Sequence, residues 1–134
     1  MNIALWVVQC GLTALFAFSG VYKGTRAKDE LVAAGQTGIS AYSDGFIRFI
    51  AAVELLGCVG LIVPWLVGIA RVLTPLAAVG LAVIMVGAAV SHTRLALANR
   101  ARRERELRNV ATNVAVFGAC LFVAIERFRM LSGQ

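Results

Sequence analysis

The segment FIAAVELLGCVGLIVPWLV, residues 49–67, contains a single charged side chain, that of Glu54. A helix needs about 20 apolar residues to cross a bilayer, so this segment predicts a membrane-spanning helix. A carboxylate at membrane depth costs roughly 2.5 to 3.5 kcal/mol on insertion scales, and such residues usually face the interior of a helix bundle and mark a site. Glu54 is therefore the first candidate functional residue.

Three further apolar runs extend the prediction to four spans. The span that holds Glu54 covers about residues 46–66, and the others cover about 3–22, 72–91 and 109–125. The chain has 134 residues, of which 60% are hydrophobic, against about 45–50% in soluble domains. We therefore expect one all-α transmembrane domain over residues 1–134. Short connections favour antiparallel neighbours, which predicts an up-down-up-down four-helix bundle.

The basic residues predict how the bundle is oriented. The net charge is +6. The following nine basic residues lie at or in the connections after the first and third spans: Lys23, Arg26, Lys28, Arg94, Arg100, Arg102, Arg103, Arg105 and Arg108. The opposite side has three: Arg71, Arg127 and Arg129. Because positive loops stay in the cytoplasm, both termini should lie on the non-cytoplasmic side.

The two longer connections have different expected roles. Residues 25–34 predict either a short interfacial helix or an ordered loop. Residues 95–107 predict helical extensions of the flanking spans, and their arginines suit anionic lipid headgroups, at about 1 kcal/mol per basic residue near the surface. Nucleic-acid binding is not expected, because no aromatic or base-reading groups accompany these arginines.

Polar side chains gather in the half of the bundle predicted to be cytoplasmic. They are Ser19, Lys23, Arg48, Glu54, His92, Asn109 and Asn113. The other half offers mainly Gln9 and Thr13. This asymmetry predicts a pocket that opens toward the cytoplasm and accepts a polar headgroup, a quinone ring or a proton.

An ionised Glu54 needs a cation or hydrogen-bond donors around it. Arg48 lies six residues away, about 240° round the helix, so it does not share a face with Glu54. Lys23, His92 and Asn113 on other helices are the better candidates. All of these polar residues also have a structural explanation. Lys23, Arg48 and His92 lie near helix ends, from which their side chains can extend to the membrane interface. Asn113 can hydrogen-bond to a neighbouring helix, and Glu54 can form a structural pair between helices.

Thiol and metal chemistry find little support in the sequence. The three cysteines, Cys10, Cys58 and Cys120, lie in different spans with no C-x-x-C pair. One His and one Glu on separate helices are too few for a metal site. No metal is therefore expected, and no catalytic motif is visible. A quinone is the one candidate cofactor, since the predicted polar pocket accepts a quinone ring.

The order of these features resembles DoxX-like membrane proteins. The stretch Phe16-Ala17-Phe18-Ser19-Gly20 before Lys23 resembles their opening, Glu54-Leu55-Leu56-Gly57 before Pro64 their second helix, and Leu73-Thr74-Pro75 with His92 their third. The resemblance implies a small four-helix protein of the bacterial inner membrane. Some relatives accompany thiosulfate:quinone oxidation, and others are linked to oxidative or thiol stress defence in membrane-associated complexes.

We therefore expect a non-catalytic subunit or membrane anchor of a redox or oxidative-stress complex, with a quinone- or lipid-type pocket. Its partners would be membrane lipids, membrane-associated redox enzymes and a second copy of the chain. Two alternatives stay open. One is a small proton-coupled transporter that uses Glu54, and the other is an assembly factor for membrane proteins in which Glu54 and Asn113 only specify packing.

Overall fold

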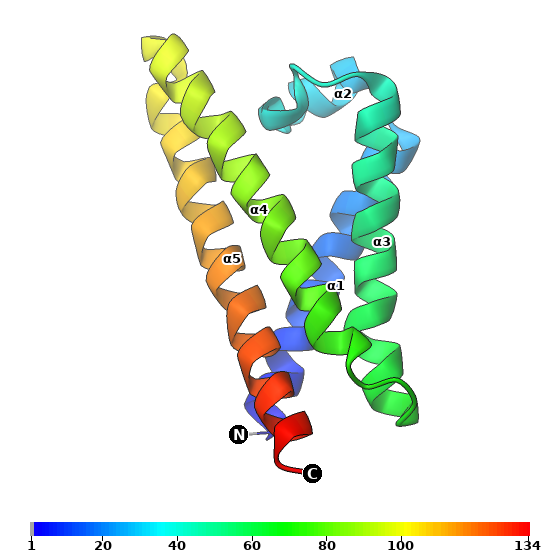
Figure 1. Ribbon diagram of the computed structural model, residues 1–134. Coiled ribbons are helices and arrows are strands. Elements are labelled where there is room, and N and C mark those ends of the chain that lie inside the picture. Colours follow the sequence, from blue (N-terminus) through cyan, green and yellow to red (C-terminus); the bar gives the residue numbers. More distant parts are fainter. Residues whose placement is uncertain (1) are drawn as a thin grey trace.

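The computed structural model describes residues 2–134, and it is all-α, as the sequence predicts (Figure 1). No strand occurs in this range. The elements are α1 (Asn2–Thr25), α2 (Lys28–Ala33), η1 (Thr37–Ile39), α3 (Asp44–Val67), α4 (Leu73–Ala98), η2 (Arg100–Arg102) and α5 (Arg103–Ser132).

The four long helices form two packed pairs. They run alternately from one end of the molecule to the other, and both termini lie at the same end (Figure 1). Helix α1 packs along α3, and α4 packs along α5. The short connection between α3 and α4 joins the pairs near the termini, whereas the pairs separate toward the other end. There the segment 26–43, which contains α2 and η1, lies across the gap (Figure 1).

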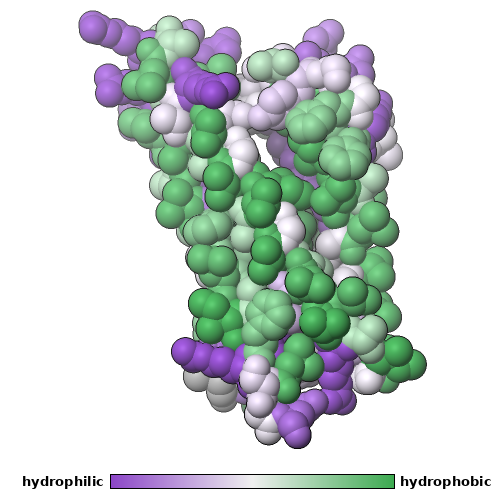
Figure 2. Space-filling model, in the orientation of Figure 1, coloured by the Kyte–Doolittle hydropathy of each residue, from purple (hydrophilic) through white to green (hydrophobic). Residues whose placement is uncertain are grey.

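Three of the long helices, α1, α3 and α4, are long and apolar enough to cross a membrane. They contain the predicted spans at 3–22 and 46–66, and nearly all of the span at 72–91. Helix α5 contains residues 109–125 but is not among the three, so the fourth span stays a prediction. Figure 2 shows apolar side chains over the middle of the molecule and hydrophilic ones at both ends.

The two longer connections fold close to expectation. Residues 28–33 form the helix α2, which settles the choice between helix and loop, and the chain then turns at Gly35 with φ +103°. Glycine adopts this left-handed backbone without steric cost. Helix α4 continues to Ala98 and α5 begins at Arg103, so the flanking helices do extend into 95–107. Asn99 interrupts them, and its side chain accepts a hydrogen bond from the Ala101 amide.

Small residues bring α3 and α4 together near their connection. A Cβ atom at Gly57 would lie 2.7 Å from the Leu81 side chain, and one at Gly60 would lie 2.7 Å from the Ala77 Cβ. Lipid is as apolar as the side chains, so helices in a membrane associate through such close packing.

Pro64 in α3 leaves the Gly60 carbonyl without its helical partner, because proline has no N–H. The Thr74 hydroxyl of α4 donates a hydrogen bond of 3.0 Å to this carbonyl. The Gln9 amide of α1 donates one of 2.6 Å to the next carbonyl, that of Leu61. Side chains of two other helices thus satisfy the backbone of α3 beside the proline.

The Thr74→Val variant should be less stable by about 1 kcal/mol, because it leaves the Gly60 carbonyl unpaired in an apolar environment. In a Pro64→Ala background the loss should be smaller, since the introduced alanine supplies the missing N–H. Thermal unfolding in detergent of the two single variants and the double variant checks this. An equal loss in both backgrounds would contradict the assignment.

Candidate functional site

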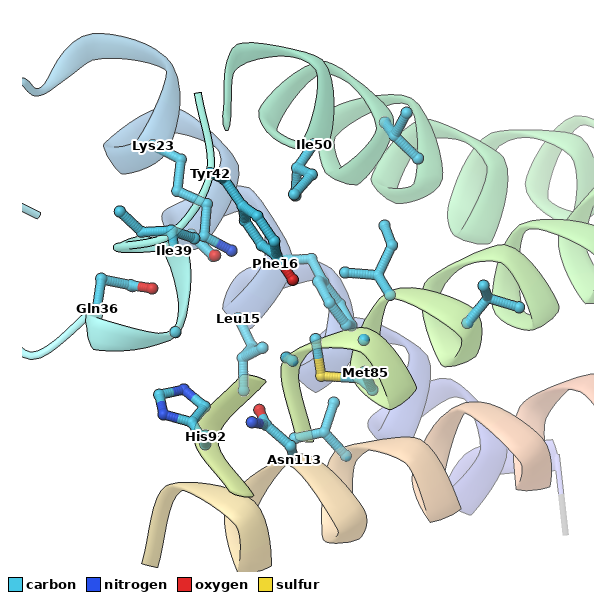
Figure 3. Close-up of a pocket in the computed structure, with 18 of the residues that line it drawn as sticks. Leu15, Phe16, Lys23, Gln36, Ile39, Tyr42, Ile50, Met85, His92 and Asn113 are labelled. Carbon is cyan, nitrogen blue, oxygen red and sulfur yellow. The ribbon is translucent and has the colours of Figure 1, made fainter. Parts of the chain in front are cut away.

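A cavity of about 450 Å³ lies between the two helix pairs, beneath the segment 26–43 (Figure 3). Ligand pockets generally measure about 300–1,000 Å³ and are mostly apolar, with a few polar groups that orient the ligand. Most of the lining here is apolar, including Leu15, Phe16, Phe49, Ile50, Val53 and Met85. The polar lining comes from Ser19, Lys23, Gln36, Tyr42, His92, Thr112 and Asn113.

One wall of the cavity holds a buried ion pair between α1 and α3. The Lys23 Nζ donates to the Glu54 Oε1 at 2.8 Å, and Glu54 is fully buried. Lys23 reaches the cavity and Glu54 lies behind it. A Cβ atom at Gly20, one turn before Lys23, would lie 2.9 Å from Leu55, so only glycine lets α1 and α3 approach this closely. The structure thus pairs Glu54 with one of its three predicted partners.

The facing wall holds a second acid–base pair, which joins α4 to α5. The His92 Nδ1 lies 2.6 Å from the Glu106 Oε2, and the Thr37 hydroxyl of η1 donates to the Glu106 Oε1 at 2.8 Å. His92 therefore pairs with Glu106 rather than with Glu54. A Cβ atom at Gly38 would lie 2.9 Å from the His92 Nε2, so the segment 26–43 rests directly on the imidazole.

Glu106 lies outside the predicted span 109–125. Burial opposes ionisation of its carboxyl, but the hydrogen bonds from His92 and Thr37 outweigh burial and lower the pKa of Glu106 below its ordinary 4.5. The Nδ1 of His92 thus faces the Glu106 carboxylate, and the Nε2 lies against Gly38.

Three neutral polar side chains at the cavity, Ser19, Gln36 and Asn113, make no side-chain hydrogen bond within residues 2–134. Asn113 is half-buried, and its amide points from α5 toward the cavity (Figure 3). A half-buried amide that lacks a protein partner needs water or a ligand. Asn113 thus gives the cavity hydrogen-bonding capacity that the fold itself leaves unused.

The structure separates the predicted site residues. Ser19, Lys23, His92 and Asn113 line the cavity, and Glu54 supports Lys23 from behind. Arg48 lies away from the cavity, where its Nη1 donates to the Lys23 carbonyl at 3.1 Å near the end of α1. That contact satisfies a backbone carbonyl beyond the reach of regular helical hydrogen bonds, so Arg48 acts structurally here.

The opposite end of the molecule is also polar inside, contrary to the expected asymmetry. Arg127 is fully buried, and its Nε donates to the Gln9 Oε1 at 2.7 Å. Its guanidinium carbon lies 5.0 Å from the ring centre of Trp6 and 4.2 Å from that of Trp65. The two indole rings stabilise the charge by cation–π contact in place of a carboxylate.

No group of three or more His, Cys, Asp and Glu side chains that could hold a metal ion occurs within residues 2–134. Cys58 and Cys120 are buried, and Cys10 is exposed. The polar side chains at the cavity named above offer hydrogen bonds.

Residues 7–124 match the family model of the DoxX-like family. This range contains all the side chains that line the cavity. Searches among curated proteins and among solved structures gave no match.

The Lys23→Met variant should lose about 3–5 kcal/mol of stability, because it leaves the buried Glu54 without its cation. The double variant Lys23→Met/Glu54→Gln should recover most of this loss, since it buries no isolated charge. Unfolding of the single and double variants in detergent measures the coupling. Strictly additive losses would show that the 2.8 Å contact carries no interaction energy.

The lowered pKa of Glu106 predicts a dependence of stability on pH. The contribution of this carboxylate is complete above about pH 5 and is lost as the pH falls below 4.5 through the lowered value. The Glu106→Gln variant should therefore be less stable at neutral pH and lose less on acidification. Melting temperatures of both proteins across this range check the sign, with Glu104→Gln, an exposed neighbour, as the control.

Proposed function

Because the chain belongs to the DoxX-like family, we propose that it is a membrane subunit that binds a quinone- or lipid-type molecule in the cavity between its two helix pairs. In this proposal it is a non-catalytic subunit or anchor of a redox or oxidative-stress complex. The observation that carries the binding site is Asn113, whose amide faces a mostly apolar cavity without a protein partner.

The chemistry of the walls favours a ligand with a polar head that accepts hydrogen bonds. Lys23 and the Asn113 amide supply donors, and His92 adds a nitrogen that can donate when it is protonated. Carbonyl oxygens of a quinone ring or phosphate oxygens of a lipid headgroup match these donors. Each basic side chain is also held by a buried acid, Glu54 or Glu106, so its position is set before a ligand arrives.

The charge distribution supports an orientation for this site. The cavity lies at the same end as the segment 26–43 and the connection between α4 and α5, where nine basic residues gather. By the positive-inside rule this end faces the cytoplasm of a bacterium, and both termini lie on the outer side of the inner membrane. The site then opens where cytoplasmic redox partners and anionic headgroups can reach it.

A proton-coupled transporter is the weaker alternative. Its essential carboxylate would need to exchange protons with both sides of the membrane, whereas Glu54 is fully buried against Lys23. The assembly-factor alternative explains Glu54 as a packing contact but gives no role to the polar cavity.

Native mass spectrometry of the protein, extracted gently from its own membrane, tests the proposal. The wild type should retain a non-covalent quinone or lipid, and Asn113→Leu should reduce that signal by about tenfold, the loss expected for a hydrogen bond worth roughly 1.5 kcal/mol. The measured mass distinguishes a quinone from a phospholipid. Asn113→Leu should leave the fold intact, because the amide makes no internal hydrogen bond.

The matched control is Thr93→Val. It removes a polar group from the end of α4 that lies near the cavity, but Thr93 does not line the cavity. It should retain the ligand like the wild type. Equal ligand signals in the wild type and in Asn113→Leu, or no retained ligand in either, would overturn the binding site. A co-purifying redox enzyme in all three proteins would support the subunit role separately.

A further inference from the structure

A second, apolar space adjoins the polar cavity. It is a groove of about 720 Å³ between α3 and α4, lined among others by Leu56, Val63, Leu73, Leu76 and Gly80. Val53 lines both the groove and the cavity, so the two spaces meet at this residue. The groove runs from this junction toward the connection between α3 and α4.

Helix α4 keeps one side of this path open. Gly80, Val83 and Gly87 follow at spacings of three and four residues, which places them on one face of the helix. Gly80 lines the groove, and Val83 and Gly87 line the cavity. A Cβ atom at Gly80 or at Gly87 would meet no atom within 4 Å. By contrast, Gly57 and Gly60 lie against α4, so these two glycines serve helix packing and Gly80 and Gly87 do not.

We propose that the ligand of the cavity is a long-chain amphipath whose hydrocarbon tail leaves the cavity past Val53 and lies in the groove between α3 and α4. This inference rests on the proposed function and extends it from the head of the ligand to its tail. The groove follows α4 from Leu81 to Leu73, over about 12 Å of the helix axis. A head group held in the cavity leaves this groove to bulk lipid, whereas a hydrocarbon chain attached to that head can occupy it.

The groove selects for shape rather than for hydrophobicity. A hydrocarbon chain in lipid is already out of water, so moving it into the groove adds only packing contacts. Its position therefore depends on the head group, which the cavity holds at the level of Lys23 and Asn113. A tail attached to that head has its exit at the junction with the groove.

Photo-crosslinking of the intact protein in nanodiscs tests this path. One probe is a benzoquinone with a decyl tail that ends in a diazirine, and a second carries the same diazirine at the end of an acyl chain of phosphatidylglycerol. Peptide mass spectrometry should find the tail label on groove residues such as Val63 and Leu76 for one of the probes, which identifies the source of the tail. An azide on the ring of the quinone probe reports the head separately.

Two glycine variants give a matched comparison. Gly80→Leu extends a side chain into the groove from a position where a Cβ atom meets nothing within 4 Å, and it should lower tail labelling there about fivefold, as roughly 1 kcal/mol of steric overlap would. Gly118→Leu on α5 also places a side chain in open space, but it lines neither the groove nor the cavity and should change nothing.

The outcomes separate this inference from the proposed function. Head labelling in the cavity combined with tail labelling elsewhere, such as along Val90 of α4 and Phe117 of α5, would overturn the tail path alone. Groove labelling that persists unchanged in Asn113→Leu would reflect bulk lipid and would also overturn it. Absence of head labelling and of any retained ligand would overturn both.

Discussion

Every charge buried between these helices has to be neutralised or hydrogen-bonded by the protein itself, because neither lipid nor a packed core provides water. The structure provides partners in three places: at Glu54 with Lys23, at Glu106 with His92 and Thr37, and at Arg127 with Gln9 and two tryptophans. The Glu54 Oε2 and the Arg127 Nη2 remain without a hydrogen-bond partner within residues 2–134. Each contact joins different elements, so the polar groups also determine which helices pack together. The first two contacts stand on facing walls of the cavity and hold its basic side chains in place.

The two ends of the molecule are built differently as a result. At the end near the termini, Thr74, Gln9 and Arg127 connect helices α1, α3, α4 and α5 through backbone carbonyls and aromatic rings. At the other end the pairs α1–α3 and α4–α5 are each joined internally, and the segment 26–43 spans the gap through Thr37 and Tyr42. The helix pairs are therefore held together directly at the end near the termini, which we call the closed end. At the opposite, open end only the segment 26–43 joins them, and the cavity lies there.

Hydropathy predicted the all-α class and the four long helices, because a run of about 20 apolar residues has few other interpretations. The Lys23–Glu54 contact was also within reach, since a buried acid requires a partner. Glu106 was missed because it stands among arginines in 95–107, where a carboxylate normally belongs to a solvated helix surface. Thr37 and Tyr42 were missed because the path of a connection has no sequence periodicity. Arg127 was taken for an external charge since it lies near the chain end, although Gln9 in an apolar helix signalled a need for a partner there.

The placement of the aromatic rings on Arg127 has a consequence for spectroscopy. The chain has two tryptophans, Trp6 and Trp65, and both lie against the same guanidinium at the closed end. Tryptophan emission therefore comes from that end of the molecule alone, and neither indole lines the cavity. Separation of α5 from α1 and α3 at this end would take the guanidinium away from both indoles, so tryptophan emission of the unmodified protein reports on that contact.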